Sequence, residues 1–158
     1  MDPEIQQLLD ERAIEDVCVR YATAIDDRDW ERLRSCFLPE AVGIYHADRV
    51  LTGYPAIEHA LRTAVTPLSR TQHLVTNVTV VVDGDEATSR CYLHAQHVRA
   101  GLPGGETFVI AGRYRDRFVH GRRVAHPRAA ARPLVDLGEP GRDGPLSRTG
   151  RDTGPGLM

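Results

Sequence analysis

An apolar helix face that leads directly into a cluster of carboxylates, within residues 14–45, constrains the fold of this chain more than any other feature. The apolar residues recur at the spacing of one face of an α-helix: Ile14, Val17, Cys18, Tyr21, Ala22 and Ile25. This pattern predicts a long helix over residues 4–26 that packs against a core. Asp26 lies at the edge of the face, so its carboxylate can point toward the core boundary instead of water.

The segments that follow predict two further helices and a short strand. Asp29 is expected to cap a short helix over residues 29–37, because its side chain can accept free backbone N–H groups. Residues 41–50 are expected to form a strand that carries Tyr45. A third helix is expected over residues 55–65, since a proline is well suited to the first turn of a helix.

From residue 72 onward, the hydrophobic period changes from that of a helix to that of strands. Residues 72–82 and 86–99 flank an Asp-Gly-Asp turn, which predicts a β-hairpin, and residues 106–119 predict a third strand. Helices followed by an antiparallel meander indicate an α+β fold. We expect the N-terminal helices to pack into a strongly curved antiparallel sheet, which would form a cone with one pocket.

Alternation along the second strand predicts which side chains line that pocket. One face is small and mostly apolar, as a wall against a helix must be, and it comprises Ala87, Ser89, Cys91, Leu93, Ala95 and His97. His94 points to the opposite face, where Tyr92 and Val98 are typical of a surface that another subunit partly covers. Because His94 and His97 point in opposite directions, they are poorly placed to bind one metal ion.

The composition of the 158-residue chain is that of one soluble domain, with 41% hydrophobic residues and a net charge of −2. Neither a basic and apolar leader nor a membrane-spanning run is present, so we expect a cytoplasmic protein without a membrane partner. The net charge gives no overall positive surface of the kind that binds nucleic acid, so we expect no nucleic-acid partner. Cys18, Cys36 and Cys91 are scattered within apolar patterns, which predicts buried free thiols.

A change of composition after Val119 divides the chain. Residues 119–158 contain no Phe, Tyr or Trp, and Arg, Gly and Pro dominate, so this stretch buries too little apolar surface to offset the entropy of ordering. We therefore assign residues 1–126 to the α+β barrel domain and expect residues 127–158 to form a disordered or loosely attached tail.

Several short motifs follow one another in a fixed order between residues 10 and 119. They are the run from Asp26 to Phe37, Ile44-Tyr45, Gly53 to Ile57, Thr71-Gln72-His73, Asn77, Asp83-Gly84-Asp85 and Gly112-Arg113-Tyr114. In order and spacing they resemble the SnoaL-like and scytalone-dehydratase-like group of the nuclear-transport-factor-type fold. The resemblance implies the same cone-shaped α+β architecture.

The resemblance also implies a catalytic site. Asp26 and His73 match the dyad of the dehydratase-type members, Tyr45 matches a tyrosine that polarises a carbonyl group, and His97 matches a second pocket histidine. Tyr21 matches a pocket tyrosine of the bile-acid dehydratases. In such a dyad, the carboxylate accepts one imidazole N–H and leaves the other ring nitrogen free to act as a base. Tyrosine hydroxyls can stabilise the enolate that results.

Leu93, Phe108 and Ile110 complete the expected substrate-binding wall. Ile110 and Gly112 stand where scytalone dehydratase has polar side chains, so scytalone is not the expected substrate.

Each candidate residue also has a simpler interpretation. Asp26 could be a solvated residue at a helix end, and His73 could be a hydrogen-bonded core histidine. Tyr21 belongs to the apolar helix face and could be a core residue with a satisfied hydroxyl group. His97 could line the pocket without taking part in chemistry.

Two hypotheses from different classes follow. The first is a cofactor-independent and metal-independent lyase or isomerase of the dehydratase type, which acts on a small, mostly apolar carbonyl or hydroxylated ring compound. Ring closure and double-bond migration would use the same residues. The second is a non-catalytic ligand-binding or structural subunit similar to the β subunits of ring-hydroxylating dioxygenases. In either case we expect a homo-oligomer, a dimer or a trimer.

Overall fold

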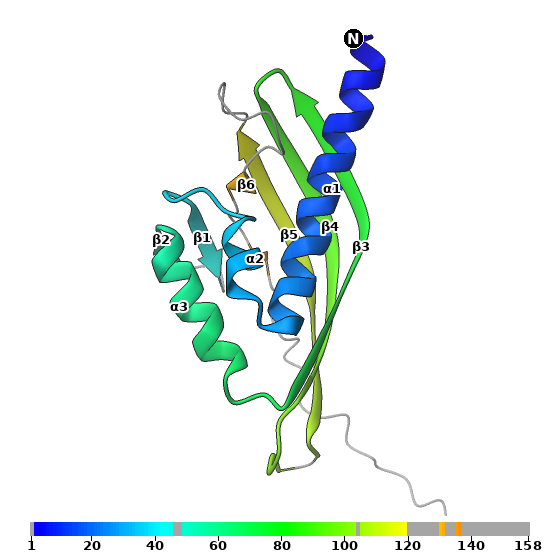
Figure 1. Ribbon diagram of the computed structural model, residues 1–158. Helices are drawn as coiled ribbons and strands as arrows, with labels where there is room; N and C mark the ends of the chain where they lie inside the picture. The colour runs from blue at the N-terminus through cyan, green and yellow to red at the C-terminus, as the bar shows by residue number, and fades with distance from the viewer. Residues whose placement is uncertain (1, 46–48, 104, 120–129, 132–134, 137–158) are drawn as a thin grey trace, which may run out of the picture.

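Three helices and two short strands lie within residues 3–65, and three long antiparallel strands follow within residues 70–119, as the ribbon diagram of the computed structural model shows (Figure 1). The structure describes residues 2–45, 49–103, 105–119, 130–131 and 135–136. The predicted α+β class, with N-terminal helices packed on an antiparallel sheet, is confirmed. Closure of the sheet into a cone stays a prediction.

The long helix α1, Pro3–Asp27, lies along one face of the sheet (Figure 1). Asp2 caps its N-terminus, because the Asp2 side chain accepts the backbone N–H of Glu4 at 2.9 Å. It ends at Arg28, which adopts the left-handed conformation with φ 55°. The predicted apolar face is buried: Ile14, Val17, Cys18, Tyr21, Ala22 and Ile25 are all at most 4% exposed.

The two short helices are α2, Trp30–Arg34, and α3, Tyr54–Val65. Asp29 caps α2 as predicted, because its carboxylate accepts the backbone N–H of Arg32 at 2.9 Å. The helix is shorter than the predicted 29–37. Residues 35–37 form a turn in which Phe37 is buried.

The prediction of a single strand over residues 41–50 was wrong. Two strands, β1 (Val42–Tyr45) and β2 (Arg49–Thr52), pair in antiparallel register instead. The intervening sequence, His-Ala-Asp, contains no Gly, Pro or Asn, so Asp48 is its one typical turn residue. Tyr45 nevertheless ends a strand, as expected.

Three long strands make up most of the sheet: β3 (Arg70–Asp83), β4 (Glu86–Val98) and β5 (Thr107–Val119). They pair antiparallel in sequence order, as the meander prediction required. A bulge interrupts β3 between Thr76 and Thr79, and such bulges bend a strand and increase its twist.

Two short segments, β6 (Ala130–Ala131) and β7 (Val135–Asp136), pair with β5. β7 also pairs with β1 in parallel, so it connects the β1–β2 hairpin to the long strands in the order β2-β1-β7-β5-β4-β3. Both segments fall within the predicted tail, residues 127–158. Most of that tail lies outside the described residues, and the predicted domain boundary at residue 126 stays a prediction.

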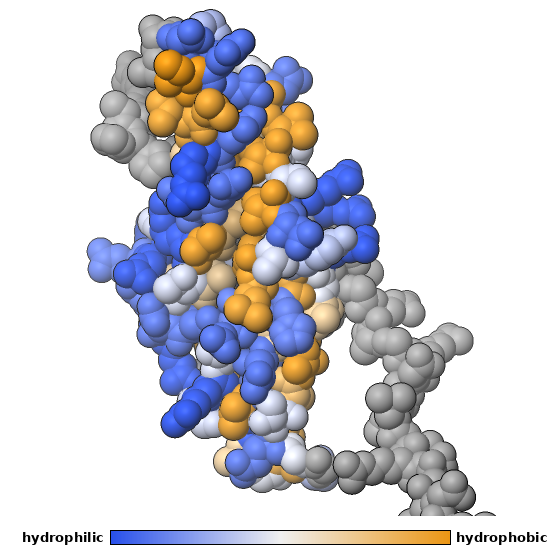
Figure 2. Space-filling view, turned by 90° about the vertical axis from the view of Figure 1, so that its right-hand side faces the viewer, coloured by the Kyte–Doolittle hydropathy of each residue, from blue (hydrophilic) through white to orange (hydrophobic). Residues whose placement is uncertain are grey.

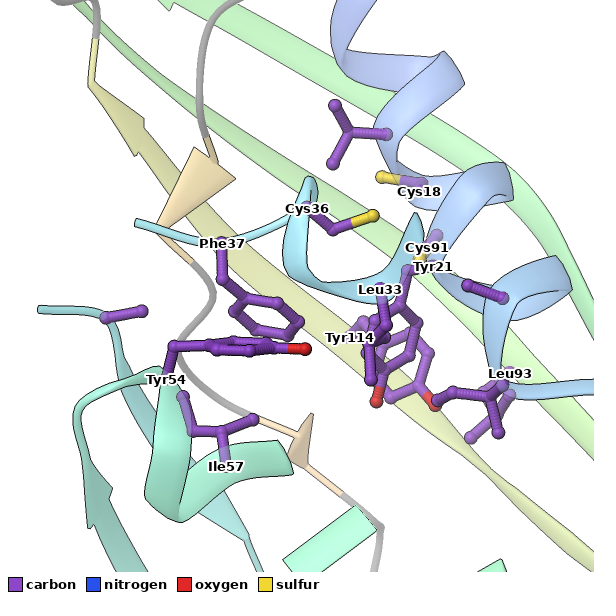
Figure 3. Packing of buried hydrophobic residues seen from close by; sticks show 14 of the residues in the cluster. Cys18, Tyr21, Leu33, Cys36, Phe37, Tyr54, Ile57, Cys91, Leu93 and Tyr114 are labelled. Carbon is purple, nitrogen blue, oxygen red and sulfur yellow. The ribbon is translucent and has the colours of Figure 1, made fainter. Parts of the chain in front are cut away.

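The core lies between α1 and the inner face of the sheet (Figure 3). All six predicted inner-face residues of β4 are at most 5% exposed, from Ala87 to His97. Cys18, Cys36 and Cys91 are buried, and none of them forms a disulfide bond within the described residues, as predicted. Within the described ranges, no helix has the length and hydrophobicity of a membrane span.

Candidate active site

Asp26 binds His73 through both of its carboxylate oxygens. Nδ1 of His73 lies 2.6 Å from Oδ1, and the backbone N–H of His73 donates to Oδ2 at 2.8 Å. The His73 side chain is 8% exposed and that of Asp26 is 22% exposed. A carboxylate that receives two hydrogen bonds from one residue fixes both the position and the tautomer of the imidazole ring.

The end of α1 brings this pair together. Asp26 lies in the last turn of α1, and His73 lies near the start of β3 on its inner side. The side chain of Arg28 donates to the backbone carbonyls of Val65 and Leu68, which ties the end of α1 to the connection between α3 and β3. Arg28 therefore has two roles: its left-handed backbone ends the helix, and its side chain holds the segment that leads to His73.

His97 is the second histidine of the site, and β4 carries it beside β3. Thr71 is its register partner on β3, and Oγ1 of Thr71 lies 2.8 Å from Nδ1 of His97. The His73 and His97 ring centroids are 5.5 Å apart, and the ring of Phe108 lies 5.1 Å from that of His97 on the other side. Burial lowers the pKa of His97 below its usual value; the neighbouring His73 lowers it further, whereas Asp26 opposes the shift.

A cavity of about 210 Å³ lies between α1, α3 and the inner face of the sheet. Seven of the eight predicted site residues line it: Tyr21, Tyr45, His73, Leu93, His97, Phe108 and Ile110. Asp26, the eighth, stands behind His73 and contacts the cavity only through it. The structure therefore brings all of the predicted residues into one site.

The lining is apolar apart from two histidines and three tyrosines. The residues that sequence reasoning did not assign to it are Ile25, Leu61, Ala64, Val65, Leu68 and Tyr114. No Arg, Lys, Asp or Glu is among the described residues that line the cavity. A neutral, largely apolar ligand fits such a lining, because an ion would lose its hydration without gaining a counter-charge.

The tyrosines come from three different elements. Tyr21 of α1 is 1% exposed, and its ring packs edge-on against Tyr114 at 5.7 Å and against Phe37 at 5.9 Å (Figure 3). Tyr21 is thus a core residue that also reaches the cavity, so both of its predicted roles are compatible with the structure. Tyr45 comes from β1, where a Cβ on Gly43 would lie 2.7 Å from its ring. Gly43 therefore provides the space that the Tyr45 ring occupies.

Sequence reasoning missed Thr71 and Tyr114, although alternation could have identified both. Thr71 lies two residues before His73 on the same side of β3, and Tyr114 shares the inner side of β5 with Phe108 and Ile110. Leu61 and Ala64 of α3 also line the cavity, but their place there depends on tertiary packing. No cluster of three His, Cys, Asp or Glu side chains suited to a metal ion occurs in the described part of the chain.

An antiparallel sheet backed by helices, with an apolar cavity between them, defines the NTF2-like class of α+β proteins with a cystatin-like fold. Within this class, the chain belongs to the SnoaL-like domain family, which it matches over residues 6–123. This family includes dehydratases and isomerases. The predicted family membership is confirmed.

Three related proteins illustrate the likeness. An uncharacterized protein of Mycobacterium tuberculosis is 33% identical over 98 residues, which are 61% of this chain and 67% of the relative. The solved structure of a function-unknown protein from M. tuberculosis has a TM-score of 0.71 and 25% identity, covering 86% of this chain and 76% of that one. A candidate scytalone dehydratase from Novosphingobium aromaticivorans has a TM-score of 0.70 and 24% identity, covering 82% and 85% of the two chains.

Proposed function

We propose that this protein is a cofactor-independent lyase or isomerase of the dehydratase type, in which His73 removes a proton from the carbon next to a carbonyl group. The observation that carries the proposal is the double contact of Asp26 with His73 at the wall of an apolar cavity. Nδ1 of His73 gives its proton to the hydrogen bond with Asp26, so Nε2 is the nitrogen with a lone pair for substrate. In the described part of the chain, no residue hydrogen-bonds that Nε2.

Asp26 serves the chemistry in two ways. It keeps the proton of the neutral ring on Nδ1, and it stabilises the imidazolium that forms when Nε2 takes a second proton. Because the carboxylate also holds the backbone of His73, the ring is fixed before substrate binds.

Dehydration follows from one proton transfer in each direction. Nε2 takes the α-proton, the carbon–hydrogen electron pair moves into the enolate, and Tyr45, assisted by Tyr21, donates a hydrogen bond to the enolate oxygen. The enolate then expels a β-hydroxyl group, which leaves as water with the proton that His73 returns. In a β,γ-unsaturated ketone without a leaving group, the double bond is conjugated with the enolate, and return of the proton to the γ-carbon gives double-bond migration instead.

The size and neutrality of the cavity define the substrate class. A dry apolar cavity of about 150 Å³ accommodates a benzene molecule in a protein of known structure, so the 210 Å³ here suits one substituted ring or a small bicyclic compound. The absence of charged residues from the described lining disfavours carboxylates and phosphates. We therefore propose a neutral cyclic ketone or hydroxyketone.

A second candidate function is that of a non-catalytic subunit. Large apolar side chains are exposed on the outer face of the sheet, among them Leu74, Val81, Tyr92 and Val109. Figure 2 shows hydrophobic residues along one side of the molecule. A partner or a further copy of the chain could cover such a surface, and a homo-oligomer remains part of the proposal.

Solvent deuterium exchange separates the two functions without knowledge of the final product. Small cyclic ketones and β-hydroxyketones are incubated with the protein in D₂O, and deuterium at the α-carbon is followed by NMR. We expect enzyme-dependent exchange for at least one ring ketone, and a loss of about 10²- to 10⁴-fold in His73→Ala.

His94→Ala is the matched control, because His94 is an exposed histidine on the outer side of β4. It should exchange at the wild-type rate. Equal rates in His73→Ala and the wild type would contradict the proposal. Absence of enzyme-dependent exchange with every ketone would favour the non-catalytic subunit.

A further inference from the structure

Thr71 lies between the two cavity histidines. Its Oγ1 is 2.8 Å from Nδ1 of His97 and 3.4 Å from Nδ1 of His73. It is the register partner of His97 and a same-side neighbour of His73 two residues along β3, so the sheet fixes its place relative to both rings. The hydroxyl group has one proton, so it can donate a hydrogen bond to only one of the two Nδ1 atoms.

The position of each proton in this group follows from the Asp26–His73 contact. Asp26 as a carboxylate can only accept, so the 2.6 Å contact requires the proton of neutral His73 to be on Nδ1. A protonated Nδ1 of His73 cannot accept from Thr71. Among the contacts of the described residues, Nδ1 of His97 is then the acceptor left for the Thr71 hydroxyl. When the hydroxyl donates its proton there, the single proton of neutral His97 is on Nε2.

We infer that Thr71 is a positioning residue that fixes His97 as a neutral hydrogen-bond donor through Nε2, opposite in tautomer to His73, which accepts through Nε2. This inference rests on the proposed function and deepens it. One cavity histidine is a base and the other is a donor to substrate oxygen, although both have the same side chain.

The burial of His97 agrees with this division of roles. Its side chain is 5% exposed in the folded protein and is flanked by Phe108, and burial lowers its pKa, so the ring stays neutral at neutral pH. A neutral donor next to His73 also avoids a second positive charge when His73 becomes an imidazolium. In the described part of the chain, no residue hydrogen-bonds Nε2 of His97.

The arrangement narrows the substrate class. The ring centroids of the two histidines are 5.5 Å apart, so one small ring can contact both. The substrate must offer an acidic C–H to His73 and, within the same ring or on a substituent next to it, an oxygen that accepts from His97. A neutral ring ketone with a second oxygen function satisfies both requirements, whereas a ketone without the second oxygen loses the His97 contact.

The test is a long-range ¹H–¹⁵N spectrum of the histidine rings at neutral pH, in the wild type, Thr71→Val and Thr71→Ser. We expect the proton of His73 on Nδ1 and that of His97 on Nε2 in the wild type. Thr71→Val should shift the His97 Nδ1 signal to that of a nitrogen without a hydrogen bond, and Thr71→Ser should restore the wild-type signal. A proton on Nδ1 of His97, or a His97 signal that Thr71→Val leaves unchanged, would overturn the inference.

The same spectrum separates this inference from the proposed function. If His73 has its proton on Nδ1 and His97 does too, the Thr71 inference fails while the Asp26–His73 pair stands. If His73 has its proton on Nε2, the proposed role of His73 as the base is wrong. The inference about Thr71 then fails too, because it assumes a proton on Nδ1 of His73.

A double-mutant cycle distinguishes positioning from a structural role. Loss of one hydrogen bond changes a rate by about 3- to 10-fold, so Thr71→Val should slow ketone exchange by that factor in the wild type. In a His97→Phe background, Thr71→Val should cause no further loss, because Thr71 acts through His97. Equal losses in both backgrounds would show that Thr71 acts on the fold instead and would overturn the inference.

Discussion

The inner and outer faces of the sheet carry similar residue types in opposite environments. On β4, His97 on the inner face is 5% exposed, whereas His94, three residues away, is exposed on the outer face. On the inner face, Tyr114 is buried against Tyr21; on the outer face, Tyr92 is 49% exposed beneath the Arg113 guanidinium. The role of a histidine or tyrosine in this protein therefore depends on the face of the strand that carries it. Residue identity alone does not assign function.

The largest expected contrast concerns carboxylates at the end of α1. Asp26→Asn should lower ketone exchange by about 10²- to 10⁴-fold, because the uncharged amide no longer stabilises an imidazolium. Asp27→Asn is the matched control: Asp27 is the next residue, is 58% exposed and pairs with Arg32 at 3.2 Å. Steady-state exchange rates and thermal melting of both variants provide the measurement. A similar loss of activity in the two variants would show that the carboxylate beside His73 has no role that the exposed carboxylate of Asp27 lacks.

The second expected contrast is in stability, between leucines on the inner and outer faces of the sheet. Leu93→Ala on the inner face should lower the free energy of unfolding by about 2–5 kcal/mol, since Leu93 is 4% exposed and a cavity would remain. Leu74→Ala on the outer face should cost less than about 1 kcal/mol, because Leu74 is 50% exposed in the chain described here. Urea denaturation monitored by circular dichroism measures both. A loss for Leu74→Ala as large as that for Leu93→Ala would indicate that another copy buries the outer face.

The stability of the fold should decrease at acidic pH because the pKa of His97 is lowered in the folded state. Its pKa is depressed in the folded state, so below its usual value of 6.5 the unfolded chain binds more protons than the folded one. Stability is therefore complete above about pH 6.5 and falls as the pH drops through the values below it. His73, Asp26 and Thr71 are the polar groups that face the ring, and Asp26 opposes the effect.

His97→Gln should flatten this part of the stability curve, and His94→Gln should leave it unchanged. Melting temperatures between pH 5 and pH 8 would provide the comparison. An unchanged curve in His97→Gln would mean that another group causes the acid sensitivity.

The smallest expected effect lies on the outer face. The guanidinium carbon of Arg113 is 5.2 Å from the centroid of the Tyr92 ring. Exposed pairs of this kind contribute about 0.5–1 kcal/mol, so Arg113→Gln should lower the free energy of unfolding by no more than that. Exchange activity should stay at the wild-type level. A large loss of activity would show that the outer face takes part in the function.

The sequence predicted the faces of the long strands well, because a period of two assigns each side chain without knowledge of the partner strand. It could not derive the Asp26–His73 contact from spacing, since the two residues are 47 positions apart. Only the resemblance of ordered motifs paired them. The β1–β2 hairpin was missed because the sequence between its strands has no Gly, Pro or Asn. The hydrogen bond of Thr71 to His97 was missed because alternation predicts the direction of a side chain but not its hydrogen-bond partner.

The covering of the cavity by Leu61 and Ala64 of α3 depends on how Arg28 ties the end of α1 to Val65 and Leu68. That contact depends on tertiary geometry. Local patterns of hydrophobicity carry no information about it.

The most direct test of the central claim is the position of the His73 ring proton, read from long-range ¹H–¹⁵N spectra of the wild type and Asp26→Ala at neutral pH. We expect a proton on Nδ1 in the wild type, with Nε2 unprotonated, and loss of this preference when the carboxylate is removed. A proton on Nε2 in the wild type, or the same tautomer in both proteins, would contradict the claim that Asp26 prepares His73 to act as a base.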